Sequence, residues 1–137
     1  MSKIIPKDKE YFFEDNVIIS QTDVKGIVTY GNRIFFNISG YKKDELIGKP
    51  YTILRHPDMP KEVFKKMWEV LQAGQSWNGL IKNLRKDGLY YWVNEEILPV
   101  KDENNKIIGY IAVQKAASKK DIQENEKIYQ KMLETQK

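Results

Sequence analysis

The chain has 137 residues, a length that suits a single domain. Hydrophobic residues make up 41% of it and charged residues 31%, which is enough apolar material to build a core and argues against a disordered chain. Cysteine is absent, and this excludes disulfides, thiolate metal sites and covalent chemistry through a cysteine side chain.

The formal net charge is +4, but the 23 basic and 19 acidic residues are interleaved, so we expect no nucleic-acid partner. The most apolar stretch, Ile107 to Val113, is far shorter than the roughly 18 residues that a membrane span needs. The first residues also lack the apolar segment of a secretory signal. We therefore expect a cytoplasmic protein that does not insert into a membrane.

The first half of the chain predicts a cap, a hairpin and short helices. Residues 1–15 mix charged and aromatic side chains and are expected to form an N-terminal cap on the main domain. Two strands follow, and Gly26 supplies the positive φ that the turn between them requires. Asn32 is expected to cap a short helix that Gly40 ends, and a second short helix stops at Gly48.

The second half predicts a longer helix and a three-stranded meander. After Pro60, apolar residues recur every three or four positions as far as Leu71, which predicts an amphipathic helix. Residues 77–85, 89–100 and 106–116 then read as strands joined by tight turns. We expect the first of these turns, which includes Arg85 and Asp87, to be solvated. Residues 118–137 predict a terminal helix with a weak apolar stripe.

Strands, then helices, then strands are typical of an α+β fold with one antiparallel sheet. We predict a five-stranded antiparallel sheet with short helices on one face, formed by residues 16–117, between the N-terminal cap and the C-terminal helix. Several motifs of this region resemble PAS sensor domains, namely Asn32 to Phe36, Ser39 to Tyr41, Glu45 to Pro50, Trp77 to Gly79, Lys82 to Asn83, Arg85 to Gly88 and Tyr91 to Val93.

A narrower resemblance rests on residues 55–60, Arg-His-Pro-Asp-Met-Pro, followed by Met67, Trp68 and Trp77. This combination is similar to the PAS domain of bacterial aerotaxis receptors, which bind FAD non-covalently. The sequence departs from that pattern in two places, because Gly26 replaces a polar residue and Lys65-Lys66 stands where the family carries an acidic one. The resemblance implies that FAD is held by Asn32, Arg55, His56, Asp58, Trp68, Asn83 and Tyr91.

The resemblance also implies a function. It predicts a cytosolic redox or energy-taxis sensor that relays the flavin's redox state to a chemoreceptor-type, methyl-accepting signalling protein. A second copy of the chain is a further candidate partner. Two alternatives stay open: a haem-binding gas sensor that uses His56, the single histidine, and a PAS module that dimerises without a cofactor.

Taken alone, each of these side chains has both a ligand-binding and a structural interpretation. The amide of Asn83 can donate and accept at a ring edge, or it can bond a neighbouring loop. Arg55 and His56 precede a helix N-terminus that attracts anions, although His56 and Asp58 are also typical of local capping. Trp68 can stack on a ring or simply pack in the core.

No set of residues predicts an enzyme or a metal centre. The serines lack the glycine pattern of a nucleophile elbow, and no phosphate-binding glycine loop occurs. Glu95 and Glu96 are neighbours on a predicted strand, so their carboxyl groups face apart. We therefore expect a binding domain without catalytic activity.

Overall fold

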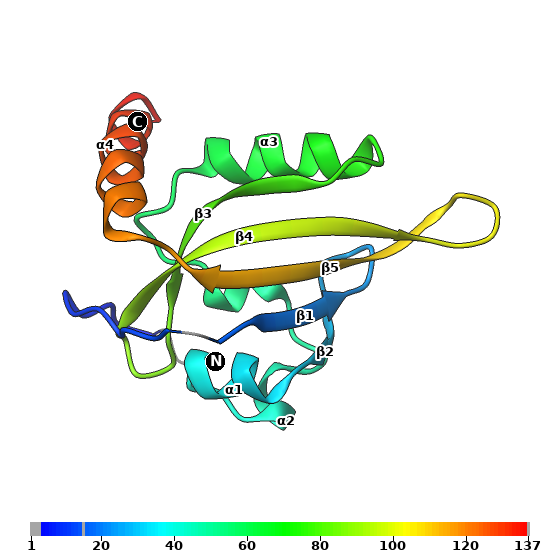
Figure 1. Cartoon of the computed structure of the whole chain (residues 1–137), viewed down its shortest axis with the longest axis horizontal. Helices are drawn as coiled ribbons and strands as arrows, with labels where there is room; N and C mark the ends of the chain where they lie inside the picture. Colours follow the sequence, from blue (N-terminus) through cyan, green and yellow to red (C-terminus); the bar gives the residue numbers. More distant parts are fainter. Residues whose placement is uncertain (1–3, 15, 137) are drawn as a thin grey trace.

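The computed structural model describes residues 4–14 and 16–136. Its centre is a sheet of five antiparallel strands in the order β2-β1-β5-β4-β3 (Figure 1). The bounds are Ile18–Thr22 for β1, Val28–Gly31 for β2, Trp77–Leu84 for β3, Tyr90–Lys101 for β4 and Ile107–Ala116 for β5. The α+β fold and its five-stranded sheet are therefore confirmed.

Glycines end or turn these elements as the sequence predicts. Gly26, Gly40, Gly48 and Gly88 all have positive φ, between 80° and 93°. Gly88 has a second reason to lack a side chain, because a Cβ there would lie 2.6 Å from the carbonyl oxygen of Ile5. The N-terminal segment can therefore pass directly over the turn between β3 and β4.

One face of the sheet, which we call the inner face, packs against the helices between β2 and β3. These helices are α1 (Arg33–Ser39), α2 (Lys43–Leu46), the 3-10 helix η1 (Tyr51–Leu54) and α3 (Lys61–Gln72). The two layers meet in buried apolar side chains such as Ile18, Phe35, Leu46 and Val93. Burial of these side chains supplies the main stabilisation of the fold.

The segment that contains η1 joins the two outer strands of the sheet. Before η1, backbone hydrogen bonds connect residues 48–51 to residues 26–28 at β2, for example from Val28 N to Lys49 O at 2.9 Å. After η1, Arg55 pairs with Asn83 of β3 through a β-bridge. We call residues 48–55 the edge connection, because they bond to the free side of the sheet at the start of β2 and again at Asn83 of β3.

The N-terminal segment lies alongside the start of β4. Tyr11 N donates to Tyr90 O at 2.7 Å, and Tyr90 N donates to Lys9 O at 3.1 Å. Phe13 packs edge-on against Tyr91, with ring centres 6.2 Å apart, whereas Phe12 is 71% exposed. Residues 1–3 and 15 of the predicted cap lie outside the described residues.

The C-terminal helix α4 (Lys119–Thr135) packs on the opposite, outer face of the sheet. Tyr129 stacks on Trp92 with ring centres 6.2 Å apart, and its hydroxyl donates to Leu80 O at 2.6 Å. Figure 1 shows α4 at the same end of the sheet as the N-terminal segment. Residue 137 of the predicted helix lies outside the described residues. None of the helices described is both long enough and apolar enough to cross a membrane.

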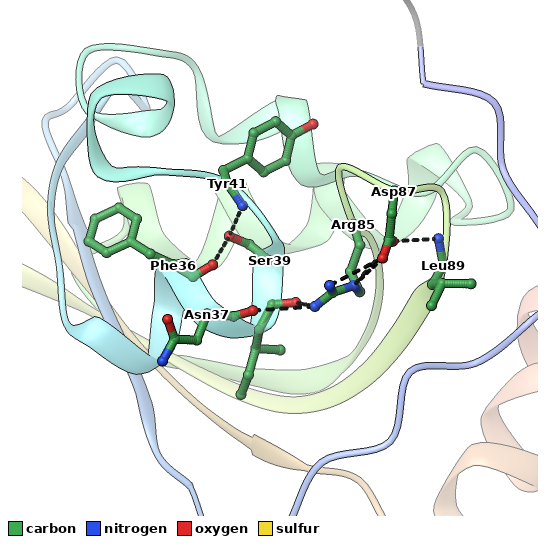
Figure 2. Close-up of polar contacts among 8 residues, drawn as sticks. Phe36, Asn37, Ser39, Tyr41, Arg85, Asp87 and Leu89 are labelled. Carbon is green, nitrogen blue, oxygen red and sulfur yellow. Dashed lines mark hydrogen bonds and ion pairs between the residues drawn. The ribbon is translucent and has the colours of Figure 1, made fainter.

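Arg85 ties the turn between β3 and β4 to the end of α1 (Figure 2). Its guanidinium donates to the carbonyl oxygens of Asn37 and Ile38 and to the Asp87 carboxylate, and it lies 3.8 Å from the ring centre of Tyr11. Only 12% of the Arg85 side chain is exposed. The expectation of a solvated turn is therefore wrong for Arg85, because neighbours distant in sequence surround it.

Candidate functional site

A cavity of about 430 Å³ lies between α3 and the inner face of the sheet. This volume falls within the range of small-molecule sites, roughly 300–1,000 Å³. The cavity is lined by Ser20, Thr22, Val24, Lys25, Gly26, Pro50, Tyr51, Thr52, Arg55, Phe64, Met67, Trp68, Leu71, Gln72, Ile81, Asn83, Glu95, Ile97, Tyr110 and Ala112.

Helix α3 forms one wall of the cavity. Phe64, Met67, Trp68 and Leu71 recur at the spacing that brings side chains to one face of a helix. Trp68 is partly exposed and meets Tyr110 of β5 edge-on, with ring centres 5.3 Å apart. The wall is therefore apolar and partly aromatic, as a flat ring system requires.

The sheet forms the opposite wall through alternate residues of three strands. Ile81 and Asn83 come from β3, Glu95 and Ile97 from β4, and Ala112 from β5. Asn83 is 2% exposed, and its Nδ2 makes no hydrogen bond of normal geometry to the described residues, although the Asn83 side chain lies close enough to the Tyr91 hydroxyl to oppose the rise of its pKa. A buried amide donor without a partner is costly, so Asn83 is suited to bind a ligand that accepts a hydrogen bond.

Glu95 belongs to a buried polar network that Gln114 and Tyr51 connect. The Nε2 group of Gln114 donates both to the Glu95 carboxylate and, at 3.1 Å, to the Tyr51 hydroxyl. The Ser20 hydroxyl donates to the Tyr51 oxygen at 3.4 Å. Burial raises the pKa of Glu95 to about 7, although the Gln114 hydrogen bond opposes that shift. Burial, and then the charge of Glu95, also raises the pKa of Tyr51 well above its ordinary value.

Two cationic side chains lie on the rim of the cavity. Lys25 belongs to the turn between β1 and β2, and Arg55 follows η1. The Arg55 guanidinium lies 3.8 Å from the ring centre of Phe64, and partial burial lowers its pKa. Because Arg55 also pairs with Asn83 through the backbone, the rim cation and the buried amide are held next to each other.

Three of the seven residues that the sequence points to line the cavity: Arg55, Trp68 and Asn83. Asn32 instead caps α1, because its Oδ1 accepts from Phe35 N at 3.0 Å and its Nδ2 donates to Val17 O at 2.9 Å. Tyr91 is fully buried on the inner face beside Phe13 and is not among the lining residues.

His56 and Asp58 also lie away from the cavity. His56 is 4% exposed, and its Nδ1 accepts a hydrogen bond from Asp58 N at 3.0 Å, so it stabilises the turn before α3. Burial and the charge of Lys82 lower the pKa of His56. Asp58 is exposed and pairs with Lys82 at 3.1 Å on the outer face. That these residues contact a cofactor stays a prediction.

The four residues of the buried polar network, Ser20, Tyr51, Glu95 and Gln114, are absent from the sequence-based set. A signal for two of them was available, because Glu95 alternates with Val93 and Ile97, and Gln114 follows Ala112 at the same spacing. Among the residues described, no group of three or more His, Asp or Glu side chains could hold a metal ion.

Comparisons with known proteins give the family. The model of the PAS fold matches residues 28–114. The aerotaxis receptor of Escherichia coli K12 is 40% identical over 116 residues, which cover 85% of this chain and 23% of the receptor. The nitrogen fixation regulatory protein of Klebsiella pneumoniae is 32% identical over 103 residues, which cover 75% of this chain and 21% of that protein.

A solved structure agrees with these sequence matches. The PAS domain of a protein from Colwellia psychrerythraea has a TM-score of 0.64 and 28% identity, over 75% of this chain and 87% of that one. The present chain spans less than a quarter of the two curated relatives above. The family match and the identity to the aerotaxis receptor show that this chain belongs to the PAS-fold family.

Proposed function

We propose that this domain binds FAD non-covalently in the cavity between α3 and the sheet. In this proposal it reports the redox state of the flavin, in the cytoplasm, to a chemoreceptor-type signalling protein. The observation that carries the proposal is the buried, unpartnered Nδ2 of Asn83 at the wall of an otherwise largely apolar slot. The similarity to a protein named as an aerotaxis receptor supports the taxis role.

The lining residues suit each part of a flavin nucleotide. Trp68, Met67 and Leu71 would face one side of the ring, and Ile81 and Ile97 the other. Asn83 would hold the polar edge, and Arg55 and Lys25 at the rim would bind phosphate. Bound flavin supplies reversible uptake of electrons, and the protein residues bind it, orient it and exclude water.

The chain offers a direct route from the cavity to the output helix. Strand β5 contributes Tyr110 and Ala112 to the cavity and ends at Ala116. Ser118 then caps α4, because its hydroxyl accepts from Asp121 N at 3.2 Å. In our proposal, a change of hydrogen bonding at the ring shifts this strand and alters how α4 meets its partner.

An absorbance spectrum of the purified protein tests the proposal. We expect an oxidised flavin spectrum that dithionite bleaches, and full release of FAD on denaturation. Light should form no covalent thiol adduct, because the chain has no cysteine. Failure to bind either FAD or FMN, even after reconstitution, would contradict the proposal. A Soret band that disappears in His56→Ala would favour haem instead.

Exchange of Asn83 for Asp separates sensing from binding. If the Asn83 amide contacts the redox-active edge, an ionised carboxylate in its place disfavours electron uptake and should lower the reduction potential. Redox titration measures this, and Asn78→Asp is the matched control because Asn78 is an exposed residue of the same strand. Equal potentials in the wild type and Asn83→Asp, both with flavin bound, would leave Asn83 with a structural role only.

A further inference from the structure

Glu95 is the only carboxyl group among the described residues that line the cavity. It lies on β4, opposite Gly79 of β3 and opposite Gln114 of β5, and only 4% of it is exposed. The next residue, Glu96, is exposed on the outer face. A strand therefore carries one solvated carboxylate and one that is enclosed beside the candidate ligand site.

The surroundings of Glu95 compensate its charge poorly. Its Oε2 accepts from Gln114 Nε2, but no described Lys, Arg or His lies within ion-pair distance. Its Oε1 accepts no hydrogen bond from the described residues, and Gln114 Oε1 is buried without a partner. A buried carboxylate without a cation costs several kcal/mol, so a purely structural role would be served better by a neutral side chain.

No other titratable group described around the cavity is an enclosed carboxyl group. Tyr51 of η1, Tyr91 of β4 and Tyr110 of β5 all have pKa values raised by burial, so they stay neutral. Lys25 and Arg55 are at the rim, and the α3 residues of the wall are not titratable. Burial brings the pKa of Glu95 to about 7, and a ring that displaced the remaining water would raise it further.

We infer that Glu95 is the proton-exchanging residue of the cavity, which gives a proton to the bound flavin ring on reduction and recovers it on oxidation. This inference rests on the proposed flavin binding. An external reductant supplies the electrons, the O–H bond of the Glu95 carboxyl breaks, and its proton forms an N–H bond on the ring. Gln114 Nε2 then stabilises the carboxylate that remains. On oxidation an external acceptor takes the electrons, and the proton returns to Glu95.

The pH dependence of the reduction potential tests the inference, with Glu95→Gln compared with the wild type. In the wild type we expect the plot of potential against pH to change slope as Glu95 titrates, by the equivalent of one proton for each complete reduction of the ring. Glu95→Gln should lose this bend. Glu96→Gln, which removes the neighbouring exposed carboxylate, is the matched control and should keep it.

A second measurement can contradict the inference from the wild type alone. The infrared difference spectrum of the wild type, reduced minus oxidised, should show loss of the C=O band of a protonated carboxyl group. That band should be absent from Glu95→Gln. A wild-type spectrum without the band, or a bend that persists in flavin-loaded Glu95→Gln, would overturn the inference while flavin binding stands. If the wild type binds neither FAD nor FMN, the proposed function fails and the inference falls with it.

Discussion

Arg85 stabilises three segments that are far apart in the sequence. Its guanidinium reaches the end of α1 and the carboxylate of Asp87 (Figure 2). It also lies over the ring of Tyr11 in the N-terminal segment. A planar fork can bond two carbonyls and one carboxylate at once, whereas a lysine ammonium cannot occupy the same geometry. The residue therefore acts as a tether between the sheet and its first helix.

Arg85→Lys should accordingly lower the free energy of unfolding by about 2 kcal/mol, even though it keeps the charge. Urea denaturation measures the loss. Lys86→Ala is the control, because Lys86 is an exposed neighbour whose side chain pairs with Glu45. A similar loss of stability in both variants would show that the turn tolerates neither change. The hydrogen bonds of the Arg85 guanidinium would then contribute no more than the Lys86 side chain does.

Trp68→Ala should weaken flavin binding about tenfold or more, because the variant loses one aromatic wall of the cavity. Its effect on stability should fall below the roughly 3–5 kcal/mol of a fully buried tryptophan, since Trp68 is partly exposed. Flavin titration and thermal unfolding are measured together. Trp77→Ala is the matched control, because Trp77 is a half-buried tryptophan that does not line the cavity. Unchanged affinity in folded Trp68→Ala would reduce Trp68 to a core residue.

At the residue scale, the sequence predicts side chains better than it predicts their partners. The resemblance to aerotaxis receptors points to Trp68 and Asn83, and the structure places both at the cavity. The role of Glu95 could not be predicted from the sequence, because it depends on the strand register that sets Glu95 opposite Gln114. The same holds for Arg85, since its partners lie 47 and 48 residues away.

At the scale of elements, the ends of helices and strands are set by short local signals in the sequence. Strands and helices begin and end within a few residues of the predicted positions, because glycines with positive φ and the Asn32 cap act locally. The position of α4 could not be predicted in this way. Its weak apolar stripe suits several partners, and only the fold brings Trp92 and Leu80 to the surface that Tyr129 covers.

Tyr129→Phe tests how α4 is held. The change removes the hydrogen bond to Leu80 O, so this buried carbonyl loses one of its donors. We expect the free energy that holds α4 on the sheet to fall by about 1 kcal/mol. Amides of α4 should then exchange hydrogen about fivefold faster if the helix opens locally. Mass-spectrometric hydrogen exchange measures this, with Ile128→Ala as the control because Ile128 is 51% exposed. Equal exchange in the wild type and Tyr129→Phe would mean that other contacts dominate the docking of α4.

At the scale of the whole molecule, Glu95 ties global stability to pH. Its pKa is about 7 in the folded chain and 4.5 in the ordinary reference state, so the folded state binds a proton more tightly. Stability should fall as pH rises from about 4.5 to about 7 and level off above that, by up to about 3 kcal/mol. Burial lowers the pKa of His56, so its contribution has the opposite sign. The stability that His56 contributes falls as the pH drops below 6.5, the ordinary pKa of a histidine.

Glu95→Gln isolates the contribution of the carboxyl group, because His56 is the same in both chains. The variant should gain stability relative to the wild type between pH 5 and pH 8, and Glu96→Gln should follow the wild type. Chemical denaturation at four pH values within that range provides the curves. Parallel curves for Glu95→Gln and the wild type would show that Glu95 ionises as an exposed glutamate does.

The edge connection also has a consequence for how the molecule avoids aggregation. An open sheet ends in two strands whose free N–H and C=O groups invite pairing with other chains. Residues 48–55 bond to β2 at one end of the connection and to β3 at the other. The same short segment thus shields parts of both terminal strands, so that intermolecular strand addition at these positions requires it to detach first. The edge connection, which borders the ligand cavity, therefore also hinders the edge-to-edge association of sheets from different molecules.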